Sequence, residues 1–226
     1  MGTIISSSII TKAQRVLQDS TGVRWDSSEM LGWLNSGQRE ILLFKPNAYV
    51  KYAPMQLVAG TRQLLPDDAV QLIDIPRNMG TTGTTPGRAI RQADREALDA
   101  SVPMWHAATA NAVVRHYIYN VLEPRAFYVY PPQPATGRGY VEAIYGATPA
   151  DAILSGAITL DDIYETPLLD YMLYRAFSKD SEYANAQRAT MYYQSFLQSI
   201  GGKARVEGVA NPAVSAPANT KPPGQV

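Results

Sequence analysis

The chain of 226 residues contains no cysteine. Disulfide bonds, thiolate zinc sites, iron–sulfur clusters and cysteine nucleophiles are therefore excluded. Histidine is nearly absent as well: His106 and His116 are the only two, and neither has a carboxylate partner at the spacing of a helical metal site. No serine stands in a nucleophile-elbow motif. We therefore expect no catalytic residue, no metal ion and no cofactor.

The chain also lacks a net charge, since 20 basic side chains balance 20 acidic ones. No whole-molecule field then favours nucleic acid, although a local basic patch stays open. No apolar run approaches the roughly 20 residues that cross a bilayer. The N-terminus has no basic segment before a long apolar stretch, so we expect no signal peptide and no membrane association.

Two helices are predicted in residues 1–48. Apolar residues recur with helical spacing between residues 7 and 18, behind serines that can cap the free N–H groups. The second helix begins with Asp26 as the N-cap, and Glu29 completes a capping box. Pro46 ends it.

Two glycines interrupt this second helix, and each costs about 1 kcal/mol relative to alanine. Gly37 falls within the apolar half of the helix, where a glycine allows another element to approach closely. Gly32 lies on the opposite face with Ser36, Asn35 and Arg39. That face is either a tolerated imperfection or a surface on which another chain lies close.

Residues 49–158 change to a periodicity near two, interrupted by prolines and glycines, which predicts a mainly antiparallel β-rich region. We expect a hairpin around Gly60 and Thr61, and residues 89–100 should start as a strand and become a short helix near Asp94. The remaining predicted strands cover residues 69–76, 113–120, 125–132 and 137–149.

The tyrosines of this region alternate with aliphatic residues. Tyr117 and Tyr119 share one strand face, and Tyr128 and Tyr130 share another. This pattern predicts a tyrosine-lined sheet face, because tyrosine is enriched at protein interfaces. A sheet covered on both sides within one chain is the alternative, and a platform that stacks on carbohydrate or bases is a third.

Residues 159–206 are helical again. Thr166 and Pro167 predict a helix start, and residues 168–179 are apolar nearly all round, which is typical of a buried helix. The last helix is expected from Ser181 to Ile200, where two glycines follow. It carries a neutral outer face with Gln187, Gln194 and Gln198. Residues 207–226 show no periodicity and should be disordered in isolation.

Three further patterns are weaker signals of chemistry. The loop GTTGTTPG, residues 80–87, lacks the lysine of a phosphate-binding loop. Asp67 and Asp68 fit a turn, and Asp161 and Asp162 fit a helix start, where negative charge is favoured. Adjacent carboxylates usually diverge, whereas a catalytic pair must face one another.

Four segments together resemble the head-to-tail adaptor (connector) proteins of tailed bacteriophages. They are RVLQDSTGVRWDSSEMLGWLNSGQREI, AGTRQLLPDDAVQLIDIPRN, FYVYPPQP and LLDYMLYRAFSKDSEYANAQRATMYYQSF. The resemblance covers about residues 6 to 200. It rests on the order and style of the segments rather than on a catalytic motif.

The resemblance implies an α+β fold in which an antiparallel helical bundle, from residues 1–48 and 159–206, holds the inserted β-rich region 49–158. It implies a virion protein at the head–tail junction, made in the host cytoplasm and forming a dodecameric ring. Its partners would be the portal protein, other copies of itself and tail proteins of the nozzle, tube or fibre. DNA would pass through the channel without specific binding.

The resemblance also suggests where contacts lie. The tail 207–226 would dock on the portal. The portal-contact candidates are Lys203, Arg205, Val206, Pro212, Val214 and Lys221. The subunit-interface candidates are Gly32, Ser36, Tyr117, Tyr119, Tyr128, Tyr130, Gln187, Gln194 and Gln198. Two other functions stay open: a tail-associated module that binds carbohydrate or protein, and a hydrolase that uses carboxylates not yet paired.

Overall fold

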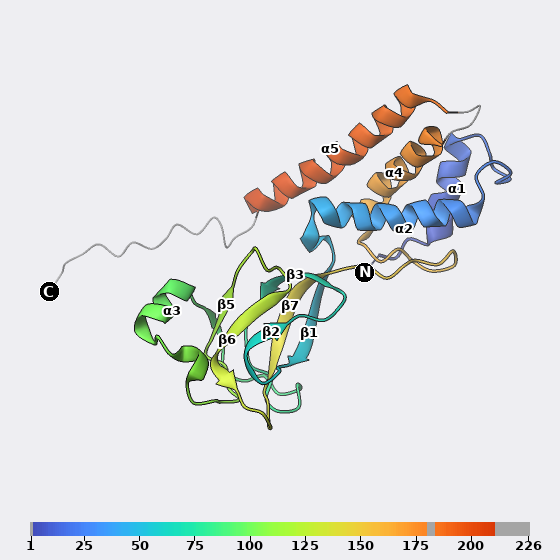
Figure 1. The fold of residues 1–226 in the computed structure, drawn as a ribbon. Helices are drawn as coiled ribbons and strands as arrows, with labels where there is room; N and C mark the ends of the chain where they lie inside the picture. Colours follow the sequence, from blue (N-terminus) through green and yellow to red (C-terminus); the bar gives the residue numbers. More distant parts are fainter. Residues whose placement is uncertain (1, 180–183, 211–226) are drawn as a thin grey trace. The chain divides into compact units, whose positions relative to one another are not determined.

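The computed structural model describes residues 2–179 and 184–210, and it shows a mixed α+β protein, as predicted (Figure 1). The chain divides into two compact units. The helical unit comprises Met1–Lys45 and Ala150–Val226, and the sheet unit comprises Pro46–Pro149. Residues 150–158, which the sequence placed in the β-rich region, thus belong with the helices.

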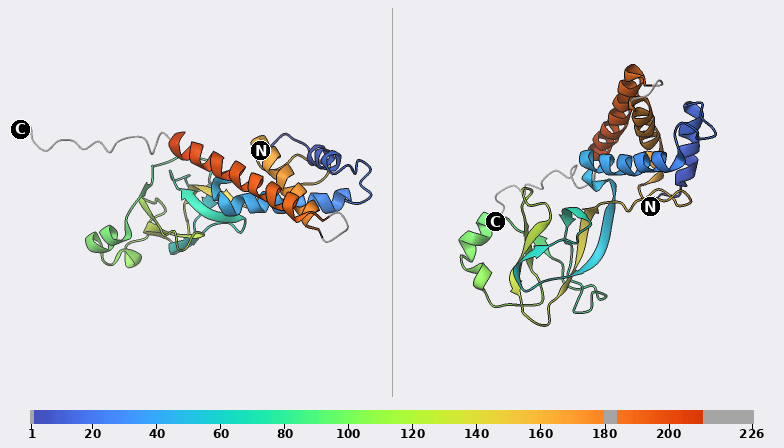
Figure 2. Two further views of the ribbon diagram at one scale, coloured as in Figure 1. Left: turned by 90° about the horizontal axis from the view of Figure 1, so that it is seen from above. Right: turned by 45° about the vertical axis from the view of Figure 1, so that its right-hand side comes forward.

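The helical unit is built around α4. Its helices are α1 (Ser6–Val16), α2 (Ser27–Phe44), α4 (Glu165–Ser178) and α5 (Ala186–Ala210). Helix α4 packs against the other three, and it lies side by side with α5 (Figures 1 and 2). Most of its side chains are buried, as its sequence predicts.

Helix α1 starts without a serine cap. Its N-cap is Ile5, and the first N–H groups of the helix bond to a distant loop: Ser6 N donates to Gly156 O at 2.9 Å and Ser7 N to Leu154 O at 3.1 Å. The predicted serine capping is therefore wrong, because backbone carbonyls take that place. At the other end, Gln18 adopts the left-handed conformation (φ 55°) and the chain leaves the helix.

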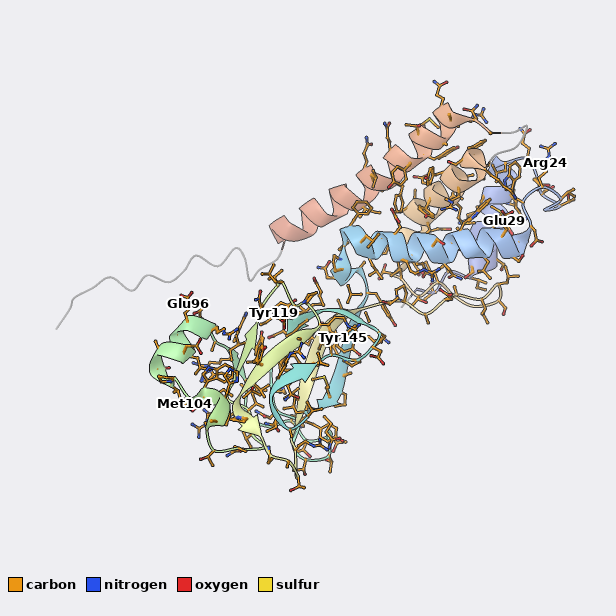
Figure 3. All side chains as sticks on the ribbon, viewed as in Figure 1. Arg24, Glu29, Glu96, Met104, Tyr119 and Tyr145 are labelled. Carbon is orange, nitrogen blue, oxygen red and sulfur yellow. The ribbon has the colours of Figure 1, made fainter. Side chains whose placement is uncertain are left out.

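Helix α2 starts as predicted at Asp26, whose carboxylate accepts a hydrogen bond from Ser28 N at 2.9 Å. The second half of the expected capping box is wrong. The Glu29 carboxylate, labelled in Figure 3, instead accepts two hydrogen bonds from Lys179 Nζ at 2.8 and 2.9 Å. This ion pair ties the start of α2 to the end of α4.

Helices α4 and α5 differ from their predicted limits. Helix α4 begins at Glu165, one residue before Thr166, directly after a 3-10 turn (Asp162–Tyr164) capped by Asp161. Helix α5 begins at Ala186, where Asn185 Oδ1 accepts from Arg188 N at 2.9 Å. The expected start at Ser181 and Glu182 lies outside the described residues.

The predicted end of the last helix at Ile200 is wrong. Helix α5 continues through Gly201 and Gly202 to Ala210, so residues 207–210 extend the helix instead of beginning a tail. Glycine permits a left-handed helix end but does not impose one, and neither glycine here has a positive φ. The rest of the expected disordered tail, 211–226, lies outside the described residues.

The sheet unit contains two sheets that share one apolar core. The strands are β1 (Val50–Gln56), β2 (Gly60–Leu64), β3 (Ala69–Asp74), β4 (Arg91–Gln92), β5 (His116–Tyr119), β6 (Ala126–Gln133) and β7 (Tyr140–Ala147). One sheet has the order β1-β7-β3 and the other β2-β6-β5-β4. All pairings are antiparallel except that of β4 with β5.

The hairpin expected around Gly60 and Thr61 is wrong. Strand β1 pairs with β7, whereas β2 pairs with β6, so the two neighbouring strands enter different sheets. Phe127, Val141 and Tyr145 lie in the core that the sheets share. A second cluster, which contains Leu98 of α3 (Arg95–Ser101) and Trp105, packs against Ile118 of β5.

Buried Asn and Gln side chains fasten several segments that have no regular backbone partner. We call such a residue an amide clamp when its carbonyl oxygen and its NH₂ group both bond to backbone or to another clamp. In the sheet unit, Asn78 donates to Arg88 O and Val114 O at 2.9 Å each and accepts from Val114 N at 2.8 Å. In the same way, Gln63 bonds to both backbone groups of Val58, and Gln133 donates to Asn111 O and accepts from Gly139 N.

Two amide clamps lie in α2 and hold the segment that leads back to α4. Asn35 accepts from Ala152 N at 2.8 Å and donates to Ala152 O at 3.1 Å. Gln38 donates to Asn35 Oδ1 and accepts from Thr159 N. The sequence placed Asn35 on the polar outer face, which is wrong, because the segment around Ala152 covers that side of the helix.

Candidate assembly surfaces

The exposed face of α5 is poor in charge. Gln187, Met191, Gln194 and Gln198 are exposed and follow one another at spacings of four, three and four residues, which places them on one stripe of the helix. Between Ala186 and Gly202, Arg188 is the only side chain that is charged at neutral pH. Solvated helix faces normally carry many charges, so this stripe suits contact with protein better than contact with water.

The opposite side of α5 is held by aromatic residues of α4. Tyr171 lies 5.2 Å from Phe196, Tyr174 lies 4.8 Å from Tyr193, and Phe177 stacks on Tyr192, measured between ring centroids. Such ring pairs add about 0.5–1.5 kcal/mol each beyond their buried area. The aromatic seam fixes which face of α5 is left outward.

A buried carboxyl group lies in the same contact. Ser195 Oγ donates a 2.7 Å hydrogen bond to Asp170 Oδ2, and Asp170 is only 9% exposed. Burial raises the pKa of Asp170, while the hydrogen bond from Ser195 lowers it by less. Ionising Asp170 is therefore harder in the folded protein than in the unfolded chain.

We expect Asp170→Asn to stabilise the protein relative to the wild type by an amount that grows from pH 4 to pH 7. Because folding raises the pKa of Asp170, the stability linked to this group is complete below its unfolded pKa and is lost as the pH rises through the folded value. Urea unfolding of both proteins across this range measures the difference. Asp19 and Asp162, whose pKa values are lowered, also make stability depend on pH, but they are present in both proteins and their contribution cancels in the difference. A pH-independent difference would contradict the prediction.

The outer side of α2 presents the second surface. Gly32 is exposed, and a Cβ placed there would meet no atom within 4 Å. Ser36 is half-buried, and its hydroxyl donates to Gly32 O at 2.8 Å. Gly37, in contrast, faces α4: a Cβ there would lie 3.0 Å from Tyr171 Cδ1 and 3.2 Å from Leu168 Cδ2. The packing of the helical unit thus explains Gly37 and leaves Gly32 without a partner among the described residues.

The tyrosine-lined face expected in the sheet unit is wrong. In the β5–β6 register, Tyr117 is opposite Val129 and Tyr128 is opposite Ile118, so the two pairs of tyrosines lie on opposite faces. Both faces are covered within the unit, by the shared core on one side and by the Trp105 cluster on the other. Hence the platform that a carbohydrate- or base-stacking module requires is not formed by these residues.

Each of the four tyrosines has contacts of its own within the unit. Tyr117 is 4% exposed and its hydroxyl donates to Asp74 Oδ1 at 2.9 Å, and burial raises its pKa far above the ordinary value. Tyr119, labelled in Figure 3, is half-buried. Tyr128 meets Trp105 edge to face, and Tyr130 stacks on His116.

The portal-contact candidates fall at the end of α5 or beyond it. Lys203, Arg205 and Val206 are part of α5. Pro212, Val214 and Lys221 lie outside the described residues.

The groups considered for chemistry serve the fold. Asp161 caps a turn, and Asp162 binds Thr3 N and Thr3 Oγ1 at 2.6 Å. Asp68 pairs with Lys51, and His106 Nδ1 bonds to Thr61 Oγ1 at 2.8 Å. In the part of the chain that the structure describes, no group of three or more His, Asp or Glu could hold a metal ion.

Within residues 2–179 and 184–210, none of the helices combines the length and the apolar character needed to cross a membrane. A search of curated proteins found no match. The family model described as "SU10 adaptor protein" matches residues 6–219, which is nearly the whole chain and includes both units. The chain therefore belongs to the SU10 adaptor protein family, which confirms the resemblance to bacteriophage head-to-tail adaptors.

Proposed function

We propose that this adaptor forms a ring under the portal, joins capsid to tail and continues the DNA channel without enzymatic activity. The observation that carries the proposal is the nearly uncharged exposed stripe of α5. The buried centres of protein interfaces are depleted of charged residues. A stripe of glutamines and one methionine can be buried against a neighbour without leaving an unpaired charge.

A ring needs two different surfaces on every subunit, because its contacts are heterologous. The α5 stripe supplies one, with Gln187, Gln194 and Gln198. The α2 surface supplies the other, where Gly32 and Ser36 let a neighbouring backbone approach. The helical unit then acts as the bundle that builds the ring. We do not extend the interface to the four tyrosines, since contacts within the sheet unit occupy them.

The end of α5 is proposed to lead to the portal. Its continuation to Ala210 carries the chain as a helix beyond the stripe. Residues 203–226 would supply the portal contact, and the ring would present a fresh surface to a tail protein.

The expected composition of the virion tests the proposal. Quantitative mass spectrometry of purified phage particles should find this protein in the same copy number as the portal protein. Gly32→Leu should remove it from the particles, because the leucine side chain would occupy the space where a neighbour lies. The variant monomer should remain folded, since leucine is a better helix former than glycine.

Gly32→Ala is the matched control, because it removes the same glycine and adds only a methyl group. Alanine should be tolerated far better than leucine in the particles. If Gly32→Leu is incorporated at wild-type copy number, the α2 surface is not part of the ring. If the wild-type protein is absent from particles, or its copy number differs from that of the portal, the ring proposal itself fails.

A further inference from the structure

A small cavity in the sheet unit is surrounded by basic side chains. It has a volume of about 330 Å³ and is lined by Arg88, Ala89, Arg91, Arg115 and His116. Arg91 lies in β4, and Arg115 directly precedes β5. The two strands run parallel with Arg91 opposite His116. Arg88 and Arg91 are close in the sequence, and the pairing of β4 with β5 brings Arg115 from a later segment, so three arginines border one cavity.

These three arginines differ from most others in the sheet unit. Arg62, Arg77, Arg95 and Arg125 each form an ion pair with a carboxylate. Arg88, Arg91 and Arg115 are exposed, and none forms an ion pair within residues 2–179 and 184–210. Grouped like charges repel each other, so this arrangement does not help the fold.

The backbone that carries the three arginines is fixed in advance. The amide clamp Asn78, 5% exposed, bonds to Arg88 O and to both backbone groups of Val114, the residue before Arg115. Arg91 N donates to Arg115 O at 3.2 Å, and Arg115 N donates to Tyr130 O at 2.8 Å. The attachment points of the side chains therefore need no rearrangement to receive a ligand, which lowers the entropic cost of binding.

The histidine in the cavity wall also has an unused polar atom. Among the described residues, His116 Nδ1 is buried and has no hydrogen-bond partner. Buried polar atoms without a partner are rare in folded proteins. The free hydrogen-bonding capacity of the cavity therefore comes from the three arginines, and the buried Nδ1 atom is a further unsatisfied polar group in the same wall.

We propose that this cavity binds a phosphate group. A guanidinium group presents five donors in a planar fork that matches phosphate oxygens. Free inorganic phosphate has four oxygens that can accept hydrogen bonds, and a DNA phosphodiester has two non-bridging oxygens with several lone pairs, so either can be held by more than one fork. The phosphate of a DNA backbone and free inorganic phosphate share this chemistry. The site is independent of ring formation, since one sheet unit supplies every residue of it.

Binding of a short fluorescent DNA duplex to the full-length protein tests the proposal, with anisotropy measured between about 50 and 200 mM salt. The site variant is Arg88→Gln/Arg91→Gln/Arg115→Gln. The slope of log Kobs against log[salt] reports how many phosphates the protein neutralises, so losing the one phosphate held in this cavity should reduce the slope by about 1 in the site variant. Inorganic pyrophosphate, tested in parallel by its effect on the Tm, detects a site that accepts only free phosphate.

The control variant is Arg62→Gln/Arg95→Gln/Arg125→Gln, which removes the same charge from the same unit at arginines already paired with carboxylates. It should bind like the wild type. Loss of DNA binding in the site variant alone supports a DNA phosphate, and loss of pyrophosphate stabilisation alone supports free phosphate. Equal losses in both variants, or no response of the wild type to either probe, would overturn the proposal. The proposal would also be overturned if the wild type bound polyglutamate, a carboxylate polymer, but neither DNA nor pyrophosphate.

Discussion

Asn35→Leu should lower the free energy of unfolding by about 2–4 kcal/mol. The substitution removes the partners of Ala152 N and Ala152 O, which are held at 2.8 and 3.1 Å in a buried position. Each buried polar group left without a partner costs about 1–3 kcal/mol. Leucine favours the helix more than asparagine does, so a loss of helix propensity cannot explain the effect.

Urea unfolding measures this decrease in stability, and Ser36→Ala is the control in the same helix. Among the described residues, Ser36 Oγ bonds only within its own helix, so its replacement should change the stability by less than about 0.5 kcal/mol. Gln38→Leu should also destabilise the protein, because it leaves the partly buried Thr159 N–H group without its acceptor. The two effects should not add, since Gln38 Nε2 donates to Asn35 Oδ1. Similar stabilities of Asn35→Leu and Ser36→Ala would refute the role of the clamp.

The same substitution at the two glycines of α2 should have opposite effects on the monomer. Gly37→Leu should destabilise by about 1–3 kcal/mol, because the new side chain has to displace the rings and methyl groups of Tyr171 and Leu168. Gly32→Leu should stabilise by up to about 1 kcal/mol, because the site is open and leucine is the better helix former.

Thermal and urea unfolding of the purified variants measures both changes in stability. The experiments use a concentration at which the wild type is monomeric. Far-ultraviolet circular dichroism confirms that both variants retain their helices. If Gly32→Leu were destabilising as well, Gly32 would have a role inside the monomer that the described structure does not show. If Gly37→Leu were neutral, α2 and α4 would not approach each other as closely as the structure indicates.

Periodicity alone predicted most individual elements of the fold. The apolar spacing of residues 7–18 and 26–44 located α1 and α2, and alternation located β3, β5, β6 and β7. The partners of these elements were harder to predict. The pairing of β1 with β7 joins residues as far apart in the sequence as Val50 and Gly146, and no local pattern specifies such a choice.

The errors have related physical causes. Asn35 looked exposed because its neighbours on the helix are polar, yet the segment around Ala152 returns to cover it. The tyrosines of β5 and β6 looked like one surface because alternation gives two faces without saying which of them is covered. The register of the pair and the cluster around Trp105 settle that point.

The candidate surfaces were predictable to different degrees. The neutral face of the last helix is visible in the sequence, since glutamine and serine recur there without acidic residues. The cavity at Arg88, Arg91 and Arg115 is not visible, because the residues join only through the parallel pairing of β4 with β5 and the contact of Asn78. A net charge of zero over the whole chain does not reveal a local basic patch of this kind.

The amide clamps have a consequence for how the loops respond to their surroundings. Asn and Gln side chains carry no charge and do not titrate, so neither acidification nor added salt weakens these contacts as it weakens an ion pair. Backbone amides in irregular segments, such as those of Ala152, Val114 and Gly139, are engaged as fully as amides inside a strand ladder. These connections should exchange their hydrogens slowly, and an irregular backbone here does not mean a mobile one.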